Sequence, residues 1–144
     1  MSDPYDLQRF VEAQDADSTY ETALHELRAG RKTSHWMWFV FPQVAGLGRS
    51  STAQHYALPG VPEAQAYLAH PVLGPRLRDC CTALLALETA DAAAVLGPVD
   101  AQKLRSSMTL FAVVAPDERA FREVLERCFG GQDDPLTREL LGRP

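Results

Sequence analysis

Apolar residues recur at every third or fourth position along most of this chain, which is the spacing that one buried face of an α-helix requires. In the clearest stretch, Tyr20, Ala23 and Leu27 share one face. Residues 18–21 before it read Ser-Thr-Tyr-Glu, a capping-box pattern, and Gly30 after it is placed to end the helix. No convincing alternation of polar and apolar residues marks a strand. The spacing therefore predicts an all-α fold.

The Pro, Gly and capping residues between the periodic stretches mark helix ends and predict a compact array of about seven helices. Residues 36–41 are either a short strand or a buried helical turn, because periodicity cannot separate the two at that length. Residues 43–51 form a loop with Gly46 and Gly48, the most flexible-looking internal stretch. Asp91 is placed to open a further short helix, and Asp100 is placed to cap the helix that starts at about residue 101. The main helices are expected at about residues 4–14, 19–29, 62–69, 72–87, 101–114, 117–129 and 135–141.

Length and composition favour one domain. The 144 residues are 46% hydrophobic and 23% charged, which suits a single compact domain over residues 1–144. A chain of this size buries roughly 70% of its extended surface, so it needs neither disulfides nor a structural metal. Cys80, Cys81 and Cys128 are an odd set with two adjacent members, which favours reduced, structural thiols. The four histidines lack metal-ligand spacing, so we expect no metal site and no cofactor.

Charge and hydropathy exclude several classes of protein. A net charge of −5 argues against general nucleic-acid binding, which needs a concentrated basic surface. The longest strongly apolar run, residues 36–41, is about three times too short to span a bilayer, so no membrane span is expected. Residues 1–6 are acidic and lack the apolar core of a secretory signal, so the expected compartment is the cytoplasm.

Lys103 and Ser107 break the apolar pattern of the predicted helix at residues 101–114. On a helical wheel both fall inside the apolar arc, whereas Arg105, Ser106 and Thr109 fall to its other side. In one interpretation, Lys103 lies in the first turn and extends to water, while Ser107 bonds to the carbonyl of residue 103. In the other, Lys103 and Ser107, with Arg105 or Ser106, line a pocket that binds an anionic group.

The aromatic segment at residues 31–38 is the second concentration of unusual residues. Both tryptophans of the chain, Trp36 and Trp38, lie beside His35, Lys32 and a neighbouring arginine. One interpretation is a buried segment with an indole in the core and His35 hydrogen-bonded. The other has an indole stacked on a planar ligand, His35 as acid, base or donor, and Lys32 or Arg31 on a charged group.

The loop at residues 43–51 adds weaker candidates. Gln43 and Arg49, with the serines that follow, could form a lid over an anion. The Gly46-Leu47-Gly48 sequence matches neither a P-loop nor a dinucleotide fingerprint, so the loop carries no specific motif.

Three stretches of the chain resemble a bacterial family. They are DLQRFV at residues 6–11, SHWMWFVFPQ at 34–43 followed by Gly46-Leu47-Gly48, and KLRSSMTLF at 103–111. They are similar to the domain-of-unknown-function family numbered 1810, and the resemblance covers about residues 3–131. It implies a small all-helical domain and supplies no activity, cofactor or catalytic residue. The calpastatin label often given to its members does not fit, because that inhibitor is long and disordered.

Three hypotheses for function follow. The first is a domain that binds or processes a small anionic ligand, nucleotide-like or phosphate-like, between residues 35–43 and 103–109. It places His35 and Lys103 within roughly 10 Å of each other in one concave site. The second is a protein-interaction module or homodimer that uses the aromatic stretch at residues 36–41 as an exposed apolar patch. The third is that both motifs are structural. Under none of the three can a residue be assigned a catalytic role. The ligand-binding candidates are Lys32, His35, Trp36, Trp38, Gln43, Arg49, Lys103, Arg105, Ser106 and Ser107.

Overall fold

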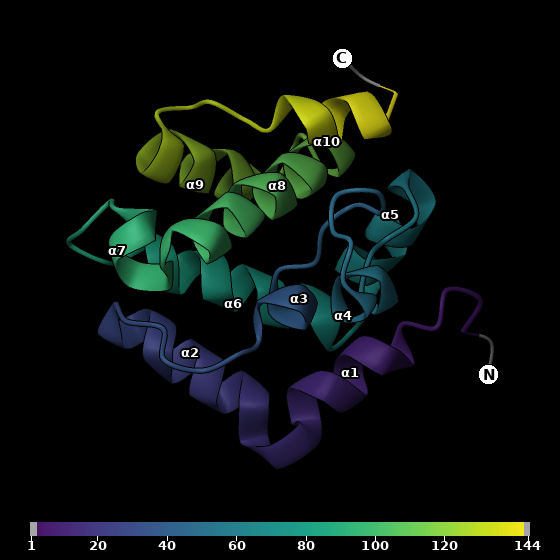
Figure 1. Ribbon diagram of the computed structural model, residues 1–144, viewed down its shortest axis with the longest axis horizontal. Helices are drawn as coiled ribbons and strands as arrows, with labels where there is room; N and C mark the ends of the chain where they lie inside the picture. Colours follow the sequence, from purple (N-terminus) through teal and green to yellow (C-terminus); the bar gives the residue numbers. More distant parts are fainter. Residues whose placement is uncertain (1–2, 143–144) are drawn as a thin grey trace.

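The computed structural model describes residues 3–142, and within them the fold is all-helical (Figure 1). The one departure is an isolated bridge between Val44 and Leu58. The helices are α1 (Gln8–Asp15), the 3₁₀ turn η1 (Ala16–Ser18), α2 (Thr19–Ala29), α3 (Met37–Val40), α4 (Ser51–His55), α5 (Val61–Ala69), α6 (Leu73–Leu85), α7 (Ala92–Leu96), α8 (Pro98–Val114), α9 (Arg119–Phe129) and α10 (Pro135–Leu140).

The predicted all-α class is confirmed, and every main predicted helix has a counterpart. Residues 36–41, left open between strand and helix, contain the single helical turn α3. Helix α4 was not predicted, because its five residues are too short to show a periodic apolar face. The interpretation of residues 1–6 as lacking a signal falls partly on residues 1 and 2, which lie outside the described residues.

Several predicted helix starts are wrong in detail. Helix α1 begins at Gln8 rather than residue 4, because Asp6 adopts a positive φ of 50°. The Asp3 carboxylate caps it from outside, accepting from the backbone N–H groups of Leu7 and Gln8. Ser18 has φ 57° and its side chain makes no cap, so the capping box does not form. The Asp91 side chain caps α7 as expected.

Helix α8 is the central element of the molecule, with α9 and α10 on one side and α6 on the other (Figure 1). It packs against α3, α5, α7, α9 and α10, so side chains are buried nearly all round it. Ser106 and Thr109 are therefore 3% and 0% exposed, which corrects the prediction that they lie outside the buried arc. Arg105, on the same side of the helix, is half-buried.

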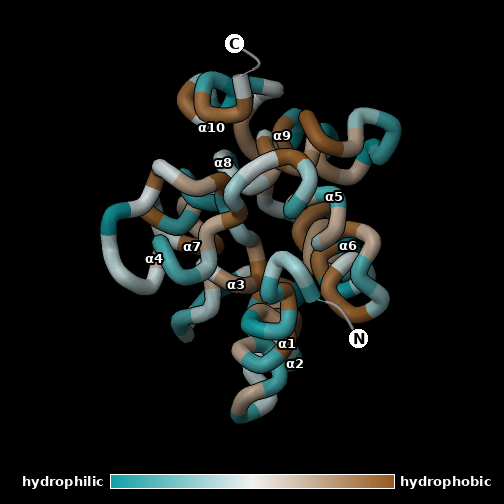
Figure 2. The backbone as a smooth tube through the Cα atoms, turned by 90° about the vertical axis from the view of Figure 1, so that its right-hand side faces the viewer, coloured by the Kyte–Doolittle hydropathy of each residue, from teal (hydrophilic) through white to brown (hydrophobic). Residues whose placement is uncertain are grey.

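Hydrophobic stretches occur in α3, α5 and α6, whereas the tip between α1 and α2 is mainly hydrophilic (Figure 2). The apolar face of the helix predicted at residues 72–87 lies in the core, with Leu77, Cys80 and Cys81 at most 1% exposed. No helix within residues 3–142 has the length and apolar character needed to cross a membrane. The loop before α4 brings residues 43–50 close to α8, where the candidate site lies.

Candidate functional site

The segment between α2 and α3 is held by one buried carboxylate. Glu26 of α2 accepts hydrogen bonds from the backbone N–H groups of Thr33 at 2.9 Å and Ser34 at 3.1 Å. The hydroxyl groups of both residues also donate to it. The indole N–H of Trp36 adds a bond of 3.0 Å. Residues 33–36 are thereby fixed against the end of α2.

These hydrogen bonds set the charge of Glu26. Desolvation by itself would raise the pKa of this carboxyl, but the donors from Ser34, Trp36 and Thr33 outweigh it and lower the pKa to about 2. Sequence reasoning did not single out Glu26. The signal that could have found it is its place three residues after buried Ala23, which puts a carboxylate beside the apolar face of α2.

The two tryptophans have different environments. Trp36 is fully buried, so it belongs to the core and does not line a cavity. Trp38, on α3, is half-buried, and its ring lies beneath the ammonium group of Lys103, 4.7 Å from Nζ to the ring centroid. Trp38 is therefore the indole that a ligand can reach.

Asp100 joins the two lysines of the chain. Its carboxylate lies 2.8 Å from Nζ of Lys32 and 3.5 Å from Nζ of Lys103. Lys32, whose side chain is only 7% exposed, also donates to the carbonyl of Ser34. The prediction that Asp100 caps a helix at residue 101 is wrong, because α8 begins earlier, at Pro98. Lys103 accordingly lies in the second turn of α8 rather than the first.

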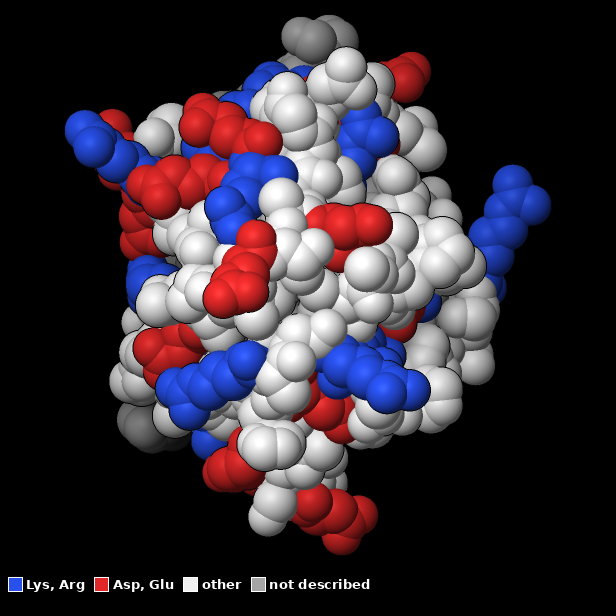
Figure 3. All heavy atoms as spheres, turned by 90° about the vertical axis from the view of Figure 1, so that its left-hand side faces the viewer, with Lys and Arg blue, Asp and Glu red and all other residues white. Residues whose placement is uncertain are grey.

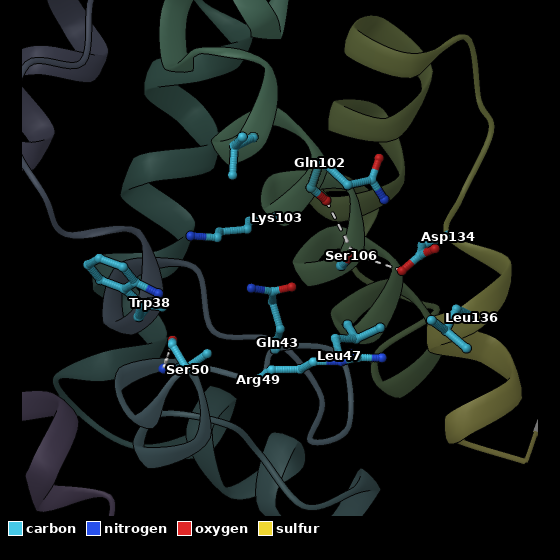
Figure 4. A pocket seen from close by; sticks show the side chains of 13 residues that line it. Trp38, Gln43, Leu47, Arg49, Ser50, Gln102, Lys103, Ser106, Asp134 and Leu136 are labelled. Atoms are coloured by element: carbon cyan, nitrogen blue, oxygen red, sulfur yellow. Dashed lines mark hydrogen bonds between the residues drawn. The ribbon is translucent and has the colours of Figure 1, made fainter.

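A cavity of about 560 Å³ opens between α3, the loop at residues 43–50, α8 and α10 (Figure 4). We call it the Lys103 cavity. Lys103 extends into or along it from α8, Gln43 and Arg49 do so from the loop, and Trp38 closes one end (Figure 4). Its lining residues are Trp38, Gln43, Leu47, Gly48, Arg49, Ser50, Ala53, Val99, Gln102, Lys103, Ser106, Asp134 and Leu136.

Backbone pairing holds the loop that carries Arg49. The N–H of Ala45 donates to the carbonyl of Leu58 at 2.8 Å, and the N–H of Leu58 donates to that of Gln43 at 2.9 Å. Ser50 then caps α4 by accepting from the N–H of Ala53. Arg49 thus lies exposed on a loop that is tied down on both sides.

Asp134 forms the opposite end of the Lys103 cavity and was missed as a site residue. Its Oδ2 accepts from the hydroxyl group of Ser106 at 2.7 Å (Figure 4) and from that of Thr137 at 2.6 Å, and its N–H donates to Thr109 at 2.8 Å. These contacts dock α10 on α8 and bring Asp134 to the wall of the cavity. A sequence signal existed, since Asp134 precedes the proline that opens α10, but it indicated only a helix start.

Arg105 and Ser107 do not line the Lys103 cavity. The guanidinium of Arg105 donates to the carbonyls of Gln132 and Asp133, so it holds the connection between α9 and α10. Ser107 is fully buried, and its Oγ has no hydrogen-bond partner, which corrects the expected bond to the carbonyl of residue 103. The interpretation of Ser107 as a pocket residue loses its geometric basis.

His35 lies in a second, smaller hollow of about 310 Å³, which we call the His35 cavity. His35 is exposed, and Lys32 and Lys103 line the same hollow. The Lys103 and His35 cavities share Trp38, Val99 and Lys103, so they meet along one edge. The structure therefore brings the two sequence clusters into one region of the surface.

Residues 36–41 do not form an exposed patch. Trp36, Met37, Val40 and Phe41 are at most 2% exposed, and Trp38 and Phe39 are half-buried, which removes the interaction surface that the second hypothesis requires. The exposed large hydrophobic residues in the described part of the chain are instead Val99, Leu136 and Leu140. Two of these, Val99 and Leu136, line the Lys103 cavity.

The chemistry of the site is that of polar binding. Ammonium, guanidinium, amide and hydroxyl groups converge with one carboxylate around an apolar rim, a composition typical of small-ligand sites. Within residues 3–142 no cluster of three or more His, Cys, Asp or Glu side chains is placed to hold a metal ion. On the face shown in Figure 3, cations and anions are intermixed without a continuous basic area.

Comparisons with known proteins agree with the resemblance drawn from the three motifs. A solved structure, the conserved hypothetical protein Rv1873 from Mycobacterium tuberculosis, is 46% identical and superposes with a TM-score of 0.93. The match covers 97% of this chain and 99% of that one. No curated protein matches the sequence significantly. The model of the family described as "Protein of unknown function (DUF1810)" matches residues 4–141. The chain therefore belongs to the DUF1810 family.

Proposed function

We propose that the protein binds a small anionic ligand in the Lys103 cavity. The observation that carries this proposal is the position of the Lys103 ammonium group, at the cavity wall and 24% exposed, with its single carboxylate partner at the long distance of 3.5 Å. A cation held this loosely keeps most of its capacity to donate charge-assisted hydrogen bonds to an incoming phosphate or carboxylate.

Arg49 is a second cation that supports anion binding in the Lys103 cavity. It approaches the Lys103 cavity from a different element, and the ion pairs found among residues 3–142 do not include it. Two cations that converge from α8 and from the loop give an anion two anchoring points. Asp134 opposes them in charge, but two hydroxyl groups already donate to its carboxylate.

Binding is favoured over catalysis by the same residues. The lining of the Lys103 cavity contains no histidine or cysteine, and its one carboxylate is tied to Ser106 and Thr137. A general base needs a proton to abstract within hydrogen-bond reach and a nucleophile it can activate. These groups serve recognition better than bond cleavage.

We place this function in the cytoplasm. The thiols support that choice, because Cys80, Cys81 and Cys128 are all free. Burial raises the pKa of all three thiols, which keeps them in the protonated, unreactive form. Such cysteines are typical of proteins in reducing compartments.

The proposal is tested by calorimetric titration of the protein with inorganic pyrophosphate, ribose 5-phosphate and citrate. We expect at least one to bind with Kd below about 1 mM and the variant Lys103→Ala to weaken that binding by about tenfold or more. Arg119→Ala, which removes an exposed cation from α9, is the matched control and should leave the affinity unchanged. Failure of all three anions to bind, or equal affinity in Lys103→Ala and wild type, would contradict the proposal.

A further inference from the structure

A third hollow, about 530 Å³ in volume, adjoins the Lys103 cavity and is walled mainly by rings. We call it the ring cavity. Four of its lining side chains are aromatic or imidazole rings, and the other two carry hydroxyl groups. The lining residues are Trp38, Phe39, Ser51, Thr52, His55 and Tyr56.

The rings are packed against one another at the edge of the core. Tyr56 contacts Phe39, with 5.3 Å between ring centroids, and His55, with 4.6 Å. Phe10, which also packs on Tyr56, is fully buried, whereas Phe39 and Tyr56 are half-buried and His55 is exposed. The surface of these rings that remains open is apolar and faces a hollow, where a planar ring gains more from stacking than it does in water.

Trp38 joins the ring cavity to the Lys103 cavity, because it lines both. Lys103 approaches the indole from α8, while Ser50 lies below the indole on the side of α4 (Figure 4). Ser51 and Thr52 of the ring cavity follow Ser50 and Arg49 of the Lys103 cavity in the chain. A molecule with an anionic end and a planar end can therefore occupy both hollows across Trp38.

We infer that the ligand is a nucleoside phosphate, with its phosphate group at Lys103 and Arg49 and its base in the ring cavity. Ser51, Thr52 and Tyr56 each bring a hydroxyl group to the lining of the ring cavity. A hydroxyl group can both donate and accept a hydrogen bond, so these groups suit the polar edge of a base. This inference rests on the proposed function, since the phosphate half of the molecule uses the Lys103 cavity.

The test compares the four common nucleoside 5′-monophosphates with ribose 5-phosphate, which lacks the base. At least one nucleotide is expected to bind about tenfold tighter than ribose 5-phosphate, which is the contribution of one stacked base. The variant Thr52→Phe fills the ring cavity from an exposed position on α4, so it should remove most of that difference. It should leave the affinity for ribose 5-phosphate unchanged.

Gln65→Phe is the matched control, because it adds the same ring at an exposed position of α5 outside the three cavities. It should leave the preference for nucleotides intact. The inference is overturned if no nucleotide binds tighter than ribose 5-phosphate, or if the preference survives in Thr52→Phe. In either case the proposed function still stands when binding of ribose 5-phosphate depends on Lys103. If neither ribose 5-phosphate nor any nucleotide binds, the nucleoside phosphate is excluded as the ligand.

Discussion

The ammonium group of Lys103 lies 4.7 Å from the ring centroid of Trp38. The other lysine and tryptophan of the chain form the same kind of pair, with Nζ of Lys32 5.0 Å from the ring centroid of Trp36. Both lysines share the carboxylate of Asp100. The pairs differ in burial: Trp36 is fully buried, whereas Trp38 is half-buried at a cavity. One pair therefore stabilises the core and the other faces a ligand-sized space.

Asp100 competes with any anion for Lys103. The variant Asp100→Asn removes this competing charge, so the affinity for pyrophosphate or ribose 5-phosphate should rise several-fold. The same change leaves the nearly buried Lys32 without its ionic partner and should lower the free energy of unfolding by about 2 kcal/mol. Calorimetric titration and urea denaturation measure the two effects separately. Weaker anion binding in a folded Asp100→Asn protein would show that Asp100 positions Lys103 rather than competing for it.

Glu26 should make stability depend on pH. Because the pKa of Glu26 is lowered from 4.5 to about 2 in the folded protein, the stabilisation is complete above pH 4.5 and is lost as pH falls from 4.5 toward 2. The shift corresponds to roughly 3 kcal/mol at pH 7. The variant Glu26→Gln should therefore be less stable by roughly 2–3 kcal/mol at pH 7, and the difference should shrink toward pH 2.

Urea denaturation of wild type and Glu26→Gln at several pH values between 7 and 2.5 measures this difference. Glu21→Gln, at an exposed position on the same helix, is the control and should change stability little at any pH. A difference between wild type and Glu26→Gln that stays constant from pH 7 to 2.5 would contradict the account of the Glu26 hydrogen bonds.

Ser106 and Ser107 are neighbours on α8 with opposite expected effects. Ser107 is buried with an unpaired hydroxyl group, so Ser107→Ala should leave stability unchanged or raise it by about 1 kcal/mol. Ser106 donates to the buried carboxylate of Asp134, so Ser106→Ala should lower stability by about 1–2 kcal/mol. Thermal unfolding of the two variants gives the comparison. A clear loss of stability in Ser107→Ala would mean that its hydroxyl group has a partner.

The sequence was sufficient to predict the helical class, because apolar periodicity reports directly on which faces are buried. It identified His35, Trp38, Gln43, Arg49, Lys103 and Ser106, all of which line one of two adjoining cavities. It could not predict that Ser106 and Thr109 are buried, since a helical wheel assumes one buried face and α8 is surrounded.

The sequence did not reveal the hydrogen bonds and ion pairs of Glu26, Asp100 and Asp134 for a different reason. Each interacts with groups that are distant in sequence or on another element, such as Ser106 and Thr137 with Asp134. Local pattern assigns an acidic residue near a helix start to capping, which is correct for Asp91 and wrong for Asp100. Only the packing of α2, α8 and α10 determines which carboxylates bind groups on other elements instead of capping a helix.

The central claim, anion binding at Lys103, is tested most directly by NMR of the two tryptophan indole N–H groups during titration with whichever of pyrophosphate, ribose 5-phosphate and citrate binds tightest in calorimetry. The account predicts a saturable shift of the Trp38 signal, little change at Trp36, whose N–H is held by Glu26, and loss of the Trp38 shift in Lys103→Ala. A Trp38 signal that does not move, or that moves equally in Lys103→Ala, would contradict the claim.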